Sequence, residues 1–195
     1  MLENDDFYPN ISHIVCMDKF GIIGINNKMP WHIPTELKYF KSVTQDSIVI
    51  MGSNTFYSIG HPLSNRINIV ISKKLNLEDT PELYVMDSIE NAIDLAWYLG
   101  LKEKKNIFII GGSSIYEQTT SYINKAYITV LDVSYYNKIQ QTENNKFVYY
   151  PYEQVIDSGF KLIESKPLET KDFFYRISTN ILEKNNESTN SESIK

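Results

Sequence analysis

Residues 106–118 read NIFIIGGSSIYEQ, and this stretch decides the class of fold. It begins as a continuous apolar run, which is typical of a strand that is buried on both faces of a sheet. The Gly111–Gly112 pair then marks a tight turn, after which a helix is expected to begin at Ser113 or Ser114. A buried strand that leads directly into a helix is the repeating unit of a largely parallel sheet.

The same order of strand and helix recurs outward from this stretch. Further strands are predicted at ISHIVCM (11–17), SIVIMG (47–52), RINIVIS (66–72), ELYVMD (82–87), YITVLDV (127–133) and, as an antiparallel hairpin, GFKLIESKP (159–167) with DFFYRISTNILEK (172–184). Helices are predicted over 34–45, after the SNT turn (53–55) to about Ile59, and over 88–100. The last has Ser88 as N-cap, Gly100 at its end and a buried face of Ile89, Ala92, Ile93, Ala96 and Trp97. The sequence therefore predicts an α/β fold with a central, mostly parallel eight-stranded sheet and helices on both faces.

The remaining segments lack a periodic apolar pattern. DKFGIIGINNKMPW (18–31) is predicted to be a long loop, and a loop of this length in a small domain is usually functional or mobile. SYYNKIQQTENNK (134–146) is polar and is also predicted to be a loop. NNESTNSESIK (185–195) cannot bury an apolar face, so a disordered tail is expected there after one domain over residues 1–184.

Composition and charge exclude several classes of protein. With 42% hydrophobic and 22% charged residues among 195, the chain is of ordinary globular type, and its net charge of −5 argues against a nucleic-acid or membrane-surface partner. The single cysteine, Cys16, cannot form an internal disulfide, and no histidine has a second ligand at metal-binding spacing, so no metal is expected. No apolar run is long enough to span a membrane, and MLENDDFYPN (1–10) lacks the order of a signal peptide. We expect a cytoplasmic monomer.

One acid stands among apolar residues in MPWHIPTELKYF (29–40). Pro34 suits the first turn of a helix, where the acid Glu36 would meet the positive end of the helix dipole, and this ordinary placement explains the residue by itself. The alternative follows from spacing. Glu36 and Phe40 are four residues apart and share a face, so both would line the same cleft. A carboxylate in an apolar cleft can hydrogen-bond a flat heterocycle.

Polar residues gather where predicted strands end. The Gly111–Gly112 turn permits close approach of an anion to the backbone, although packing explains a tight turn equally well. Thr55 could cap its helix or contact a phosphate, and Lys73, after Ser72, could meet a phosphate or simply be solvated. Arg66 is either a surface residue or a bidentate partner for a substrate carboxylate. Ligands of open α/β sheets bind at this edge.

The order of these motifs is more specific than any one of them. The chain has G24-INNK-MPW-x-I-P-x-E-L-x-x-F, then IVIMGSNTFYSIG-HPL-SNR-INIVIS, then IFIIGGSSIYEQ and AYITVLD. Over residues 11–183 this series resembles the dihydrofolate reductase family. The resemblance implies that family's fold, with NADPH as cofactor and dihydrofolate as substrate. Hydride would pass from the nicotinamide C4 to pterin C6, with protonation at N5, supplying folate for one-carbon and thymidylate metabolism.

The resemblance also implies site residues. Glu36 matches the active-site acid that hydrogen-bonds the pterin, Trp31 the tryptophan that positions water and the nicotinamide, and Thr129 the threonine near the pterin amino group. Arg66 matches the arginine that grips the glutamate α-carboxylate. The implied walls around the substrate are Ile14, Val15 and Cys16 (partly through backbone), Leu37, Phe40, Ile59 and Leu63. The implied cofactor residues are Ile23, Gly24, Ser53, Asn54, Thr55, Ser72, Lys73, Gly111, Gly112, Ser113, Ser114, Ile115 and Tyr116, with a cis peptide between Gly111 and Gly112.

The sequence departs from the family at three places. Ser53 and Ser114 stand where basic residues near the 2′-phosphate of NADPH are common, which leaves Lys73 as the substitute. Ser113 replaces a third glycine and is expected to cap the helix. The family's acidic–Thr pair after the TxLD strand is missing, so closure of the active-site loop is expected to differ. Two other functions stay open: a same-fold reductase of another heterocycle, such as the aminopyrimidine of riboflavin synthesis, and a catalytically idle relative that binds a ligand or partner.

Overall fold

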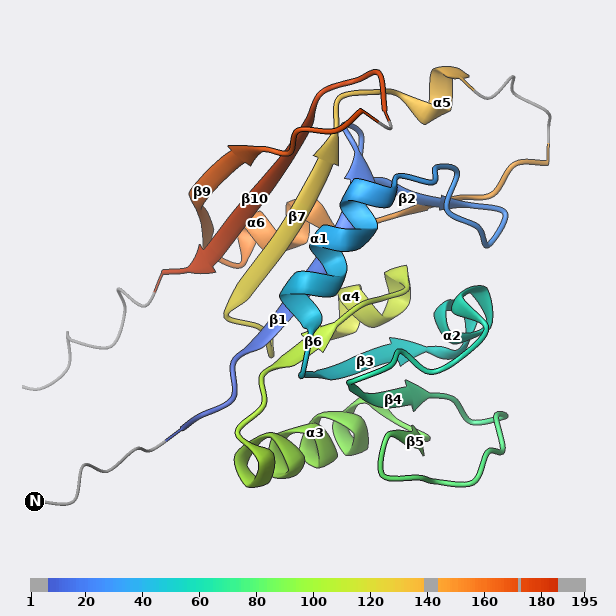
Figure 1. Cartoon of the computed structure of the whole chain (residues 1–195), viewed down its shortest axis with the longest axis vertical. Coiled ribbons are helices and arrows are strands. Elements are labelled where there is room, and N and C mark those ends of the chain that lie inside the picture. Colours follow the sequence, from blue (N-terminus) through green and yellow to red (C-terminus); the bar gives the residue numbers. More distant parts are fainter. Residues whose placement is uncertain (1–6, 139–143, 172, 186–195) are drawn as a thin grey trace, which may run out of the picture.

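The computed structural model describes residues 7–138, 144–171 and 173–185, and an eight-stranded sheet lies at its centre (Figure 1). The strands run in the order β5-β4-β3-β6-β1-β7-β10-β9. Their bounds are β1 Ile11–Asp18, β3 Ile48–Gly52, β4 Ile67–Ile71, β5 Leu83–Met86, β6 Ile107–Ile109, β7 Lys125–Leu131, β9 Phe160–Pro167 and β10 Ile177–Lys184. Every pair is parallel except β7–β10 and β10–β9. The predicted fold class and the C-terminal hairpin are confirmed.

Helices cover both faces of this sheet. Their bounds are α1 Pro34–Thr44, α2 Ser53–Ile59, α3 Ile89–Glu103, α4 Ser113–Thr119, α5 Tyr135–Lys138 and α6 Tyr152–Asp157. On one face, side chains of α3, α4 and α6 pack with alternate strand residues such as Val15 and Ile50. On the other face, α1 and α2 pack with Ile14, Val49 and Met51. Because strand side chains alternate between the two faces of a sheet, neighbouring β1 residues such as Ile14 and Val15 pack in cores on opposite faces.

Helix α3 differs from its prediction at its C-terminal end. Ser88 is the N-cap as predicted, and its hydroxyl accepts a hydrogen bond from the Asn91 N–H over 3.2 Å. The helix does not end at Gly100 but continues to Glu103 and closes with Lys104 in the left-handed region. Gly100 is required by packing instead, because a Cβ there would lie 2.7 Å from Pro9 Cγ. The predicted burial of Trp97 is also wrong, since its side chain is 39% exposed.

The segment predicted as the long loop 18–31 contains a strand. β2 (Ile22–Ile25) pairs antiparallel with β8 (Phe147–Tyr149), and the two form a separate small sheet. Helix α5 lies inside the segment 134–146 that was predicted to be irregular, and α6 was not predicted. Short elements of one to two turns carry too few residues for a periodic signal, which explains both omissions.

The predicted tail falls almost wholly outside the described residues. Of residues 185–195 only Asn185 is described, and its N–H donates to the Gly159 carbonyl over 3.2 Å. Within the described ranges, no helix combines the length and the apolar character that crossing a membrane requires.

Candidate active site

Glu36 is a buried carboxylate in the first turn of α1. Its side chain is only 5% exposed, and no basic group forms an ion pair with it among the described residues. Burial raises the pKa of Glu36 to about 7, because the charged form loses its hydration without gaining a cation. An acid placed only to meet the helix dipole would stay hydrated, so the ordinary explanation of Glu36 does not suffice.

Cys16 lies close to this acid, and Trp31 lies beside Cys16. Burial raises the pKa of the Cys16 thiol, and the neighbouring Glu36 charge raises it further. The Trp31 indole N–H influences the same thiol but does not reach hydrogen-bond geometry, and this buried N–H has no hydrogen-bond partner among the described residues. Trp31 is held by its ring, which packs against Tyr135 at 5.1 Å between centroids. An unpaired N–H beside a protonatable acid fits a bound water or a polar ligand atom.

The sheet provides the floor of this site. Cys16 on β1 lies opposite Thr129 on β7, and Thr129 is buried. Ile14 lies two residues before Cys16 and faces the same side, toward α1. Val15 instead packs in the core under α3 and α4, so only its backbone could face a ligand on the α1 side. Half-buried Phe40, Ile59 and Leu63 pack around the Ile14 cluster, whereas Leu37 is exposed.

Arg66 lies at the far end of α1 and is not a surface residue. It is 7% exposed, its Nε donates to the Ser64 carbonyl over 3.1 Å, and its Nη1 donates to Thr44 Oγ1 over 2.9 Å. Burial lowers the pKa of the guanidinium, and no carboxylate forms an ion pair with it in the part of the chain that the structure describes. A held cation without a carboxylate partner is suited to a ligand carboxylate.

Two turns at the carboxyl ends of β3 and β6 meet beside this floor. The Gly52 N–H donates to the Gly111 carbonyl over 2.7 Å, and a Cβ on Gly112 would lie 3.5 Å from Thr55 Oγ1. The Gly111–Gly112 peptide is cis, as the resemblance implies. Gly111 has φ +114° and a Cβ on it would crowd the Tyr116 ring at 3.1 Å, so any other residue would be strained there. The bare backbone leaves a place where a ligand can approach closely.

Neither predicted helix cap forms. Glycines occupy the N-cap positions of both helices, Gly52 for α2 and Gly112 for α4, and no side-chain cap bond is present. Thr55 lies within α2 and faces Gly112. The Ser113 hydroxyl donates to the Tyr149 carbonyl over 2.6 Å instead of capping α4. Ser113 therefore joins α4 to β8.

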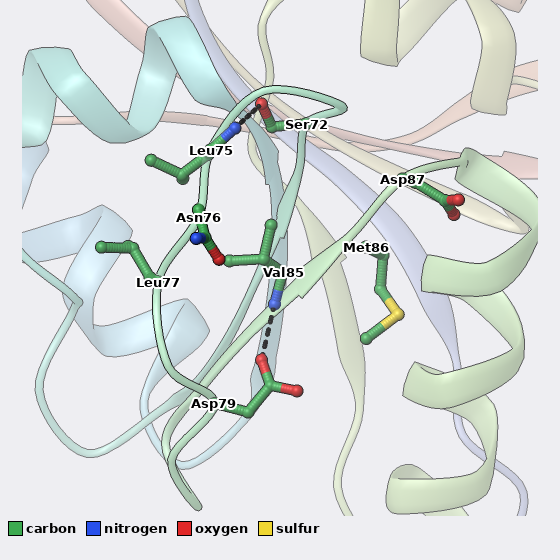
Figure 2. A pocket seen from close by; sticks show the side chains of 8 residues that line it. All are labelled: Ser72, Leu75, Asn76, Leu77, Asp79, Val85, Met86 and Asp87. Atoms are coloured by element: carbon green, nitrogen blue, oxygen red, sulfur yellow. Dashed lines mark hydrogen bonds between the residues drawn. The ribbon is translucent and has the colours of Figure 1, made fainter.

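The outer part of the candidate cofactor edge is polar but weakly basic. Ser53 is half-buried, while Asn54, Lys73 and Ser114 are exposed. The Ser72 hydroxyl accepts from the Leu75 N–H over 3.0 Å and fixes the turn after β4. A hollow of about 390 Å³ lies beside this turn. Its lining is half apolar and half polar, and includes two acids (Figure 2): Ser72, Leu75, Asn76, Leu77, Asp79, Val85, Met86 and Asp87. The acids make the hollow unsuited to a phosphate.

A second hollow, of about 580 Å³, lies beside the connection between β9 and β10 and involves neither Glu36 nor the glycine turns. Among the described residues, no cluster of three or more His, Cys, Asp or Glu side chains could hold a metal ion.

The residues that hold the segment 18–31 in place were not predicted from the sequence. The Asp18 carboxylate is buried; its Oδ1 accepts from the N–H groups of Phe20 and Ile22, and its Oδ2 accepts from the Tyr135 N–H, each over 2.9 Å. Asn26 in the turn after β2 pairs its backbone N–H and its Oδ1 with Lys146 over 3.0 and 2.9 Å. An Asp or Asn that begins a turn is a recognisable signal for Asp18. These contacts also fix Ile23 and Gly24 on β2 beside Val148.

Comparisons with known proteins identify the family to which the chain belongs. The family profile described as Dihydrofolate reductase matches residues 10–166. Dihydrofolate reductase type 9 of Escherichia coli is 38% identical over 136 residues, which are 69% of this chain and 75% of that one. Dihydrofolate reductase of Buchnera aphidicola (strain Bp) is 43% identical over 63% of this chain and 71% of its own length. Dihydrofolate reductase of Bacillus subtilis is 37% identical over 61% of this chain and 67% of its own length.

A solved structure shares the fold. Dihydrofolate reductase from Enterococcus faecalis, complexed with NADP(H) and RAB-propyl, superimposes with a TM-score of 0.74 over 92% of this chain and 98% of that one. The two sequences are 23% identical, so this likeness concerns the fold alone.

Proposed function

The chain belongs to the dihydrofolate reductase family, and we propose, from that premise, that buried Glu36 assists the reduction of 7,8-dihydrofolate to tetrahydrofolate. The cofactor of this reaction is NADPH, and its product supplies one-carbon and thymidylate metabolism. The observation that carries the proposal is the burial of Glu36: the residue is 5% exposed and forms no ion pair among the described residues, and burial raises its pKa to about 7.

Glu36 would act by orienting and polarising the pterin. Its carboxylate oxygens are acceptors for the ring's 2-amino group and N3, and a group whose pKa lies near neutrality exchanges a proton readily at working pH. Holding the acid in a dry, fixed place means that no solvent must reorganise when charge develops on the ring. The unpaired Trp31 N–H supports a water between the acid and N5, and Thr129 closes the floor beside them.

The glycine turns fit the cofactor. Side-chain-free backbone at Gly52, Gly111 and Gly112, with Thr55 opposite, leaves space that a Cβ would fill, and the first-turn amides of α4 suit phosphate oxygens. NADPH, when bound, supplies the hydride. Ile23 and Gly24 on β2, Ile115 and Tyr116 on α4, and the polar residues Ser53, Asn54, Ser72, Lys73, Ser113 and Ser114 are the further residues that we assign to it.

Arg66 favours folate over the alternative substrate. A buried guanidinium whose described partners are a carbonyl and a hydroxyl gains most from a carboxylate, and the aminopyrimidine of riboflavin synthesis has no glutamate tail to offer one. Phe40, Ile59 and Leu63, half-buried around the Ile14 cluster on the α1 side, would contact the benzoyl group, with exposed Leu37 at the rim.

We also propose a cytoplasmic monomer without a nucleic-acid partner. Glu36, Arg66 and both glycine turns come from a single chain, so a second copy is not needed to complete the site. The net charge of −5 disfavours contact with phosphate backbones. Sedimentation at increasing concentration tests the monomer, and a mass that doubles would contradict it.

The activity is tested by mixing the purified protein with dihydrofolate and NADPH and following the loss of reduced-nicotinamide absorbance. We expect turnover that stops when either compound is omitted. Absence of turnover, together with protection by folate against thermal unfolding, would instead favour an idle ligand-binding relative.

A further inference from the structure

His13 is a buried titratable residue without a role in the proposed reaction. Its side chain is fully buried on β1, opposite Ile109 of β6 and Ala126 of β7, one residue before Ile14. Burial lowers the pKa of His13 to about 3. The imidazole is therefore neutral at any pH at which a reductase would be assayed.

The hydrogen bonds of His13 determine its tautomer. Nε2 lies 2.9 Å from Thr119 Oγ1, and Nδ1 lies 3.0 Å from the Tyr150 hydroxyl. The Thr119 hydroxyl donates its own hydrogen to the Ile115 carbonyl over 2.6 Å, so it can only accept from His13. Nε2 therefore carries the proton, and Nδ1 accepts the hydrogen of Tyr150. The result is one directional chain of three hydrogen bonds with no unpaired ring nitrogen.

This chain joins the two sides of the active site. At one end, Thr119 is the last residue of α4, the helix that follows Gly111–Gly112. At the other end, the Tyr150 N–H donates to the Gly21 carbonyl over 2.9 Å, and the preceding residue, Tyr149, pairs with Ile22 of β2. The loop strand β2 is thus connected to α4 through the middle of the core.

Ring contacts reinforce the junction. Three aromatic rings meet edge to face around His13. The centroid of the His13 ring lies 5.0 Å from that of Tyr116 and 5.8 Å from that of Tyr150, and the two tyrosine centroids are 5.1 Å apart. Two exposed bonds run parallel to the buried chain, from Ser113 Oγ to the Tyr149 carbonyl and from Gln154 Nε2 to the Glu117 carbonyl. A break in the buried chain costs more than a break in either exposed bond, because water cannot replace the lost partner.

We propose that His13 is a positioning residue that couples NADPH binding at the Gly111–Gly112 turn to the ordering of loop residues 21–25. The inference rests on the proposed function, because it takes NADPH to bind at that turn. His13 would act through Thr119 and Tyr150, without contact to NADPH or dihydrofolate. Since coupling between two sites is reciprocal, an ordered loop also strengthens cofactor binding by the same factor.

The chain offers a closely matched pair of variants for the test. Thr119 and Thr120 are neighbours, both buried, and each hydroxyl donates to a carbonyl four residues earlier. Only Thr119 also accepts from His13. Thr119→Val and Tyr150→Phe therefore break the chain at either side of the imidazole, while Thr120→Val removes a comparable hydroxyl and leaves the chain whole.

Amide hydrogen exchange at residues 21–25, with and without saturating NADPH, measures the coupling directly, and fluorescence titration gives the NADPH dissociation constant. In the wild type and in Thr120→Val, we expect NADPH to slow exchange at these amides. In Thr119→Val and Tyr150→Phe, this protection is expected to fall about fivefold or more, with a matching rise in the dissociation constant.

Two results would overturn the inference. The first is that Thr119→Val and Tyr150→Phe keep the wild-type protection at residues 21–25 and the wild-type affinity for NADPH, while their melting temperatures fall as much as that of Thr120→Val. His13 would then contribute to the stability of the fold only. The other is a wild type that binds NADPH without any protection at residues 21–25. A wild type that does not bind NADPH would contradict the proposed function, and this inference with it.

Discussion

Arg66 Nη1 donates a hydrogen bond to Thr44 Oγ1 over 2.9 Å, and through this bond one helix positions both ends of the proposed substrate site. α1 carries Glu36 in its first turn and Thr44 as its last residue. Between these residues the helix axis rises by about 12 Å. The geometry of a single rigid helix thus sets the separation between the acid for the heterocycle and the cation for the carboxylate.

Replacing Arg66 tests the carboxylate end. In Arg66→Leu we expect the KM for dihydrofolate to rise roughly 10–100-fold with little change in kcat, because charge-assisted hydrogen bonds to the substrate are lost in ground and transition states alike. Steady-state kinetics measure this. Arg176→Leu, at the other arginine of the chain and exposed, is the control. An unchanged KM in Arg66→Leu would remove the assignment.

Replacing Glu36 tests the acid. Glu36→Gln keeps the size of the side chain and is expected to slow turnover at neutral pH roughly 10²–10⁴-fold, the usual scale for lost acid–base assistance. Glu90→Gln is the matched control, because Glu90 also lies in a first helical turn but is exposed. A Glu36→Gln enzyme with a near-normal rate would show that another group supports protonation of the pterin.

The pH profile should report the same acid. Because burial raises the pKa of Glu36 to about 7, its protonated form is abundant below that pH and scarce above it. Because N5 of the pterin takes up a proton during the reduction, we expect kcat/KM for dihydrofolate to fall as the pH rises through about 7 and the site loses the proton that Glu36 holds; kcat/KM reports such groups of the free enzyme. A profile that stays flat from pH 6 to pH 9 would argue against this acid, and Glu36→Gln should lack the inflection.

Burial of Glu36 also makes folding depend on pH. The unfolded chain loses this proton near the ordinary pKa of 4.5, whereas the folded chain holds it to about 7, so the free energy of unfolding falls as the pH rises between these values. The loss is about 3 kcal/mol and is complete above pH 7. Thermal unfolding at pH 5 and pH 8 measures it. From pH 5 to pH 8, the melting temperature of the ligand-free wild type should fall more than that of Glu36→Gln. Equal shifts in the two proteins would contradict the raised pKa of Glu36.

Lys73 is the residue on which NADPH preference should depend. Ser53 and Ser114 carry no charge, and Lys73 is an exposed cation at the end of β4. We expect Lys73→Met to raise the KM for NADPH several-fold and to leave the KM for NADH unchanged, because only NADPH carries the 2′-phosphate. Lys74→Met, one residue further along the turn, is the control. An equal rise in the KM for NADPH and for NADH would show that Lys73 attracts both cofactors through its charge and does not recognise the 2′-phosphate.

Local patterns predicted the framework well. Apolar runs such as 106–110 identified the buried strands, Pro34 and Ser88 identified helix starts, and the cis Gly111–Gly112 turn followed from the resemblance. The strands and the helix starts depend on neighbours within a few residues, which is the range over which sequence carries a periodic signal, whereas the cis peptide was implied only by the family. The end of α3 was mispredicted because Gly100, a usual helix stop, lies inside the helix, at a place where Pro9 leaves no room for a Cβ.

By itself the sequence determined the chain order of the eight strands of the main sheet and of helices α1 to α4, the presence of one acid in an apolar helix, and the family. The tertiary structure alone decided that Glu36 is buried, that Arg66 is held by Thr44, and that β2 pairs with β8. It alone placed His13 between Thr119 and Tyr150, more than a hundred positions away along the chain. Burial and long-range hydrogen bonds depend on which distant segments meet, and no local pattern of residues encodes that meeting.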